Sequence, residues 1–296
     1  MQPLALIRLL RPHQWTKNLL VFVPLITSHS WGRPQAWSAA LVVFALMCAL
    51  ASAGYALNDA LDAERDRGHP GKAHRPIAAG VISPATGVVV ALLLVIAAVL
   101  ATWLFARWHD TPPAMSLYFA LPAYLLGTLG YSLWLKRLVI ADVCVLSLLY
   151  VLRIVAGAGA IAVPLSPWLL AFAGFVFLSL AMVKRVIEYR ERGDAASASR
   201  PYRHDDVPML EMAGISAAMC SVLVLALYTQ SLDVRRLYAQ PDIVFLLCPV
   251  MLYWLLRVWL HARRGQLPGD PVLFAIRDPV SWCCAIAMLL VVLWAM

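Results

Sequence analysis

WSAALVVFALMCALASAGYALNDALDAERD, residues Trp37 to Asp66, begins as a long apolar run and ends in a cluster of acids. The run Trp37 to Leu57 is uncharged and long enough to cross about 30 Å of hydrocarbon as a helix. Four carboxylates and one amide then follow within the nine residues Asn58 to Asp66. Charge crowded at the end of a membrane helix needs a cation or a substrate to offset the repulsion. The segment therefore predicts a membrane helix that ends in a binding site.

The spacing of these acids indicates what they bind. On a helix, Asn58, Asp62 and Asp66 lie on one stripe, each four residues after the last, with Asp59 beside them. The stripe is about 12 Å long. This length suits two Mg²⁺ ions, or one ion and a polyphosphate. Mg²⁺ usually takes one or two carboxylates from the protein and completes its shell with phosphate oxygens and water. The alternative is that the acids only mark a helix end in water. The nine residues Asn58 to Asp66 hold a quarter of the chain's 16 acids, however, and this concentration favours a binding site.

The composition is that of a polytopic membrane protein. Of 296 residues, 62% are hydrophobic and 14% are charged, and the mean hydropathy is +0.77. No long polar stretch separates the apolar blocks, so we expect one transmembrane domain over residues 1–296. The net charge of +8 does not indicate nucleic acid, because the basic residues lie between apolar runs. All six cysteines lie inside predicted spans, where they act as small apolar residues rather than as disulfides.

Nine apolar runs are long enough to be membrane spans, so the expected fold is an all-α bundle of about nine transmembrane helices. The first is short, and we expect it to be retained rather than cleaved as a signal peptide. The runs are Leu19 to Trp31, Trp37 to Leu57, Pro84 to Phe105, Ala114 to Leu135, Val139 to Val163, Trp168 to Val183, Met209 to Thr229, Ile243 to Leu260 and Val280 to Met296.

The distribution of basic residues predicts the orientation. Nineteen of the 24 lysines and arginines lie on the side of the N-terminus and the acidic cluster, and four lie on the other. This bias places that side in the cytoplasm and the C-terminus outside it, in a cell (inner) membrane. Two long connections fall on the cytoplasmic side, Asn58 to Ile82 and Lys184 to Pro208, and long polar loops are where function concentrates. Within the second, the small-residue stretch Ala195 to Ser199 is expected to be mobile.

Basic residues near the acidic cluster are candidate phosphate ligands. Lys72 and Arg75 stand in a turn-rich loop, where they either hold phosphate oxygens or only anchor the loop to the cytoplasmic side. Lys17 stands just before the first apolar run. A lysine in this position usually extends its charged end from the end of a span to the membrane interface.

Further candidates lie later in the chain, at the start of the second long connection and in a span. Lys184 and Glu188 share a helix face, although this spacing alone is also that of an ordinary helix end. Arg153 stands in the stretch Val143 to Val163, which is otherwise uncharged, and needs a partner, which is either another span or a phosphate.

At these residues the chain resembles the UbiA superfamily of intramembrane prenyltransferases. Asn-Asp-x-x-Asp-x-x-x-Asp at Asn58 to Asp66 is similar to the first acidic motif of that superfamily, which binds Mg²⁺ and a diphosphate. The resemblance is closest to the decaprenyl-phosphate phosphoribosyltransferase branch. The motifs that carry it are RPHQWTKN (11–18), DRGHPGKAHRPIAAG (66–80), LYVLRIVAG (149–157), Lys184-Arg185-x-x-Glu188 and AIRD (275–278).

The resemblance implies transfer of 5-phosphoribose from phosphoribosyl diphosphate (PRPP) to a polyprenyl phosphate, with release of diphosphate. It implies Mg²⁺ as cofactor and Asp62, Asp66 and Glu188 as catalytic residues. The phosphate-binding residues would be Lys17, Lys72, Arg75, Arg153, Lys184 and Arg185.

Two other functions remain open. An aromatic or quinone-precursor prenyltransferase would use a prenyl diphosphate donor, but such members usually carry a second Asp-x-x-x-Asp motif where Lys184 to Glu188 stands here. A cation transporter would bury its carboxylates near the midplane rather than at a loop mouth. The sequence leaves the prenyl chain length and the oligomeric state open, a homo-oligomer included.

Overall fold

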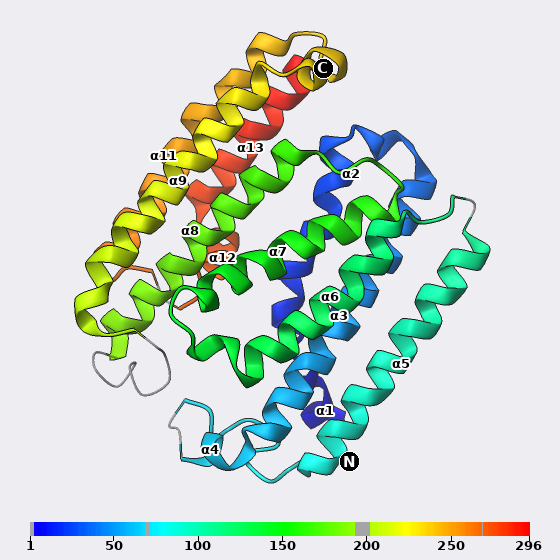
Figure 1. The fold of residues 1–296 in the computed structure, drawn as a ribbon, viewed down its shortest axis with the longest axis vertical. Helices are drawn as coiled ribbons and strands as arrows, with labels where there is room; N and C mark the ends of the chain where they lie inside the picture. Colours follow the sequence, from blue (N-terminus) through cyan, green and yellow to red (C-terminus); the bar gives the residue numbers. More distant parts are fainter. Residues whose placement is uncertain (1–2, 69–70, 110, 193–201, 268) are drawn as a thin grey trace. The chain divides into compact units, whose positions relative to one another are not determined.

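The computed structural model describes residues 3–68, 71–109, 111–192, 202–267 and 269–296 (Figure 1). In these ranges every regular element is a helix and no strand is present. The chain forms two compact units: the first comprises residues 1–133 and 152–164, and the second residues 134–151 and 165–296. One long helix, α7 (Ala141–Ala160), contributes its first half to the second unit and its second half to the first.

The first unit is built around one long helix, α3, which begins with Pro34 in its first turn, where a missing N–H costs nothing. Besides part of α7, the unit contains α1 (Pro3–Leu10), the 3-10 helix η1 (Pro12–Phe22), α2 (Val23–Thr27), η2 (Ser30–Gly32), α3 (Pro34–Leu61), α4 (Ala63–Arg67), α5 (Pro84–Trp108) and α6 (Met115–Leu133).

Small residues let the helices of the first unit approach closely. α3 packs against α5, α6, α1 and η1, and alanines of α1, α3 and α5 make up much of the shared core. In α7, a Cβ placed on Gly157 would lie 2.1 Å from the carbonyl oxygen of Val21. A glycine is therefore required where this half of α7 meets η1.

The second unit packs three long helices together: α8 lies against α9, and α11 contacts both (Figure 1). Gly214 of α9 receives the indole of Trp259 from α11, whose Nε1 donates to Ser179 of α8 at 2.9 Å. Besides part of α7, the unit contains η3 (Leu135–Arg137), α8 (Pro167–Arg192), η5 (His204–Asp206), α9 (Val207–Thr229), α10 (Leu232–Leu237), η6 (Pro241–Leu246), α11 (Leu247–Arg263), α12 (Pro271–Arg277) and α13 (Pro279–Ala295).

The prediction of an all-helical membrane fold is confirmed, but the count of nine spans is not. All nine predicted runs are largely helical, yet six helices in the described residues are long and apolar enough to cross a membrane, or seven if the bent pair α12 and α13 is one span. The run at Leu19 is divided between η1 and α2, which are too short, and α6 is diluted by Gly, Ser, Thr and three tyrosines. The single domain over residues 1–296 remains a prediction.

The two long connections are partly helical. The first contains the end of α3 and all of α4, and the second contains the last two turns of α8, which ends at Arg192. Opposite charges at helical spacing between Lys184 and Arg192 favour this extension. The small-residue stretch Ala195 to Ser199 lies outside the described residues. The six cysteines are free, as the sequence indicated.

Candidate functional site

The acidic motif spans the junction of α3 and α4. α3 ends at Leu61, Asp62 takes a non-helical conformation with φ −94° and ψ 9°, and α4 begins at Ala63. The hydrogen bonds from Asp62 N to Asn58 O and from Asp66 N to Asp62 O, both 2.9 Å, keep the four-residue spacing across the junction. The backbone therefore joins the predicted series Asn58, Asp62 and Asp66, although it bends at the middle residue.

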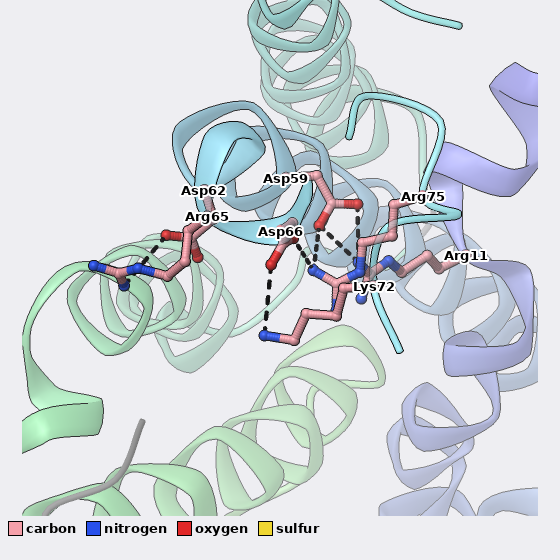
Figure 2. Close-up of polar contacts among 7 residues, drawn as sticks. All are labelled: Arg11, Asp59, Asp62, Arg65, Asp66, Lys72 and Arg75. Atoms are coloured by element: carbon pink, nitrogen blue, oxygen red, sulfur yellow. Dashed lines mark hydrogen bonds and ion pairs between the residues drawn. The ribbon is translucent and has the colours of Figure 1, made fainter. Parts of the chain in front are cut away.

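The side chains group differently, because Asp59 and Asp66 share one cation, Arg75 (Figure 2). Both carboxylates are almost fully buried, at 2% and 1% exposure. The Arg75 nitrogen Nη1 lies 3.1 Å from Asp59 Oδ1 and 2.5 Å from Asp66 Oδ2, and Lys72 Nζ lies 3.6 Å from Asp66. Arg11 completes the group by donating to both oxygens of Asp59, at 2.6 and 2.8 Å. Buried carboxylates require such pairing.

Arg11 is held in an unusual conformation. Its φ of 51° is in the left-handed region, which non-glycine residues seldom adopt. Its guanidinium lies over the ring of Tyr55, 5.0 Å from the centroid, while it clamps Asp59. Because such backbone strain persists only where the surroundings impose it, the contact with Asp59 is a built feature of this site.

The loop after α4 is fixed by its own apolar residues. Ile77 and Ile82 are buried in the core formed by α1, α3 and α5, and Ala79 N donates to Arg75 O at 2.8 Å. These contacts hold Lys72 and Arg75 beside the acids. Burial is the main cause that lowers the pKa of Lys72 below its usual value; the Asp66 carboxylate opposes this shift and the Arg75 guanidinium adds to it.

Asp62 points away from the Asp59–Asp66 group, and its carboxylate lies 3.9 Å from Arg65 (Figure 2). In the described residues, no three Asp, Glu, His or Cys side chains converge as a ready-made metal centre. Mg²⁺ in phosphate-processing sites needs only one or two carboxylates from the protein, with phosphate and water oxygens as its other ligands. The oxygens of Asn58, Asp59, Asp62 and Asp66 are of the right kind, and Asp59 and Asp66 already converge on a cationic nitrogen. These residues therefore fit Mg²⁺.

Arg153 belongs to a buried polar cluster of the first unit. Its Nε donates to Asn18 Oδ1 at 2.8 Å, its Nη2 donates to the Tyr124 hydroxyl at 2.9 Å, and its guanidinium lies over the Tyr124 ring. Asn18 in turn donates to Cys48 Sγ at 3.2 Å. Half-buried Lys17 precedes Asn18 on η1. This cluster joins α7, η1, α6 and α3.

The second predicted motif lies near the end of α8, in the second unit. Lys184 Nζ lies 3.8 Å from Asp270 Oδ2, and both side chains are partly exposed. Arg185 is fully buried, its Nε donates to Asp142 Oδ2 at 2.6 Å, and its Nη1 contacts Glu188. Glu188 is 19% exposed. The structure thus divides the motif into an accessible lysine, a buried arginine and a partly exposed carboxylate.

Sequence reasoning did not single out Arg11 as a ligand of Asp59, nor Asp142 as the partner of Arg185. The sequence nevertheless marks both residues. Arg11 opens the quoted RPHQWTKN motif, and Asp142 is the sole acid in the apolar run from Val139 to Val163. An acid in a span needs a cation from another helix, but the sequence does not say which cation.

Comparisons with known proteins identify the family and the fold. A model of the UbiA prenyltransferase family matches residues 19–274. Among solved structures, the fold is similar to a UbiA homolog from Archaeoglobus fulgidus bound to GPP and Mg²⁺, with a TM-score of 0.67 and 16% identity over 98% of both chains. It is also similar to digeranylgeranylglyceryl phosphate synthase, with a TM-score of 0.65 and 14% identity over 100% of this chain and 97% of that one. At these identities the likeness concerns the fold.

Three relatives share more sequence. The chain is 36% identical to the uncharacterized protein y4nM of Sinorhizobium fredii over 92% of this chain and 52% of that one, and so spans about half the relative's length. It is 34% identical to nodulation protein NoeC of Azorhizobium caulinodans, over 95% of this chain and 89% of that one. It is 35% identical to decaprenyl-phosphate phosphoribosyltransferase of Mycolicibacterium smegmatis, over 62% of this chain and 57% of that one. The match therefore covers less than two thirds of either protein. Together with its several membrane-span helices, these matches show that the chain is a multi-pass membrane protein of the UbiA prenyltransferase family.

Proposed function

We propose that this protein transfers 5-phosphoribose from PRPP to a polyprenyl phosphate of decaprenyl type, with Mg²⁺ as cofactor. The observation that carries the proposal is the motif Lys184-Arg185-x-x-Glu188 on α8, which places a partly exposed lysine where prenyl-diphosphate enzymes of the superfamily usually carry a second pair of aspartates. Cations suit a donor with a second phosphate group, at the ribose 5 position. The similarity to decaprenyl-phosphate phosphoribosyltransferases supports the same donor.

In the proposed reaction, the bond from ribose C1 to the diphosphate oxygen breaks and a bond from C1 to an oxygen of the polyprenyl phosphate forms. The leaving diphosphate takes the bonding electrons. The acceptor phosphate is already an anion, so no general base is required. A Mg²⁺ ion held by Asn58, Asp59, Asp62 and Asp66 would supply positive charge to the leaving diphosphate.

The chain's own cations would bind the phosphates of both substrates. Lys72 and Arg75 are proposed to hold diphosphate oxygens, since they lie beside the acidic motif and are partly exposed. Lys184 is proposed to bind the 5-phosphate, and Glu188 to orient a ribose hydroxyl, a phosphate or a metal-bound water. Lys17 and Arg153 are the remaining candidates for phosphate binding. Positioning and electrostatics would then account for the rate.

The proposed location is the inner membrane, with the N-terminus and both long connections in the cytoplasm. PRPP is water-soluble and would reach the acidic motif from that side, whereas the lipid acceptor would present its phosphate at the interface. The nineteen-to-four distribution of basic residues supports this orientation.

The test is a product assay on the purified protein with two donor and acceptor pairs. One reaction contains PRPP, decaprenyl phosphate and Mg²⁺, and the other contains a prenyl diphosphate with an aromatic acceptor. Mass spectrometry of the lipid fraction should show phosphoribosylated polyprenyl phosphate in the first and no product in the second. Turnover of the aromatic pair without any response to PRPP would instead favour an aromatic prenyltransferase.

A further inference from the structure

Asp142 is fully buried in the first turn of α7, and both of its carboxylate oxygens accept hydrogen bonds. Oδ2 accepts from Arg185 Nε at 2.6 Å, and Oδ1 accepts from the Tyr202 hydroxyl. A carboxylate with this burial cannot reach a substrate. Its effect on the reaction must therefore pass through the groups it holds.

Arg185 is the first of these groups, and it connects Asp142 to Glu188. The guanidinium is fully buried and contacts Asp142 through Nε and Glu188 through Nη1. Because the guanidinium is planar, fixing Nε on Asp142 also fixes the direction in which Nη1 points. The Asp142 carboxylate balances the charge of Arg185 and holds the guanidinium in place beside Glu188. Glu188 is 19% exposed, so it can meet a substrate.

Tyr202 is the second group that Asp142 holds. Its hydroxyl donates to Asp142 and accepts from Ile140 N at 3.0 Å, while Tyr189 donates its hydroxyl to the Tyr202 carbonyl. Burial, followed by the contact with Asp142, raises the pKa of Tyr202 above its usual value, which keeps the hydroxyl protonated as a donor. Asp142 thus links α7 to the end of the connection that leads from α8 to α9.

We infer that Asp142 and Arg185 are positioning residues that set the place of the Glu188 carboxylate and keep a cation beside it, and that Tyr202 holds Asp142 for this task. The inference rests on the proposed function, in which Glu188 orients the donor. It gives Arg185 a different role from the phosphate contact that the resemblance implies. The buried guanidinium, occupied by two carboxylates, supports this role.

A double-mutant cycle tests the inference. The variants are Asp142→Asn, Glu188→Gln and the double variant, with kcat and the donor KM measured for each. Asp142→Asn should lower kcat about tenfold, with the donor KM changed less than about twofold. In the Glu188→Gln background the same change should have little further effect, because coupled residues are not additive. Single-turnover measurements at high enzyme concentration keep the slow variants measurable.

Ser179→Ala is the matched control for the loss of a buried hydrogen bond. Ser179 is on the same helix as Arg185 and accepts from Trp259 Nε1 at 2.9 Å. This variant should lower thermal stability but leave kcat unchanged. If Asp142→Asn does not fold, Tyr202→Phe removes a single hydroxyl from the network and should show the same dependence on Glu188.

Two outcomes would overturn the inference. The first is that the effects of Asp142→Asn and Glu188→Gln multiply, which would make Asp142 merely structural. The second is that Arg185→Lys raises the donor KM equally with and without Glu188→Gln, which would indicate a direct phosphate contact. If the wild type consumes a prenyl diphosphate and not PRPP, the proposed function fails. The cycle is then run with the prenyl donor, where the same outcomes apply.

Discussion

Asp59 and Asp66, seven residues apart, each place a carboxylate oxygen on the same nitrogen of Arg75, at 3.1 and 2.5 Å. Two buried carboxylates that converge in this way repel each other unless a cation lies between them. The protein supplies this positive charge from its own chain, through Arg75, Arg11 and Lys72. The negative charge of the pair is thus balanced within the fold, without help from a substrate.

The first prediction concerns Asp66 as a metal ligand. Asp66→Asn keeps the shape of the side chain but removes its charge, and should lower kcat about 100-fold or more, because metal stabilisation of the leaving group is worth several kcal/mol. Glu64→Gln is the matched control, since Glu64 is an exposed acid of the same segment and should change kcat less than about twofold. Mg²⁺-dependent product formation measures both. Near-normal turnover in Asp66→Asn would remove Asp66 from the proposed metal site.

Chelation should separate the role of Mg²⁺ in turnover from any role in folding. EDTA should abolish product formation, whereas the midpoint of thermal unfolding in detergent should fall by no more than a few degrees. The reason is that Arg11, Arg75 and Lys72 already balance the acids. A metal that bound the folded state tightly would add to its stability by mass action. A fall of about 10 °C or more would show that the ion is structural.

The sequence predicted the acidic motif but not its side-chain partners. Helical spacing identified Asn58, Asp62 and Asp66 as a series, and the backbone hydrogen bonds follow that series. The grouping of Asp59 with Asp66 depends on a bend at Asp62 and on a loop anchored by Ile77. Both are tertiary effects that spacing within one helix does not contain.

The count of nine spans is not confirmed, for a similar reason. Apolar length predicted a span at Leu19 to Trp31, but this run winds first as the 3-10 helix η1 and then as the five-residue α2. The long 3-10 segment places Asn18 against Arg153. Composition reports the apolar character of such a segment but not how its backbone is wound.

Lys184 provides the prediction on donor choice. Lys184→Gln should raise the KM for PRPP about 10- to 100-fold, the range expected when a charge-assisted hydrogen bond to phosphate is lost. Asp270→Asn removes the charged partner 3.8 Å away and leaves an amide oxygen to accept from Val272 N. It should change this KM little. If both variants have the same effect, the lysine acts through its ion pair and not through the donor.

The orientation can be tested with reporter fusions. With nine spans and the observed distribution of lysine and arginine, a reporter fused after Met296 should be extracytoplasmic, and one fused after Gly80 should be cytoplasmic. The two fusions control each other, because they are expected on opposite sides. Reporters that read the same side would mean that the number of crossings between these points is even.

Gly157 provides a prediction about packing. Gly157→Ala would bring a Cβ to within 2.1 Å of the Val21 carbonyl oxygen, a backbone atom that moves only with η1. Overpacking of this kind destabilises by about 1–3 kcal/mol. Gly174→Ala in α8 is the control, because nothing lies within 4 Å of the added methyl group. There alanine should stabilise the helix by up to about 1 kcal/mol. Thermal unfolding in detergent should therefore shift in opposite directions for the two variants, and equal midpoints would contradict the close contact between α7 and η1.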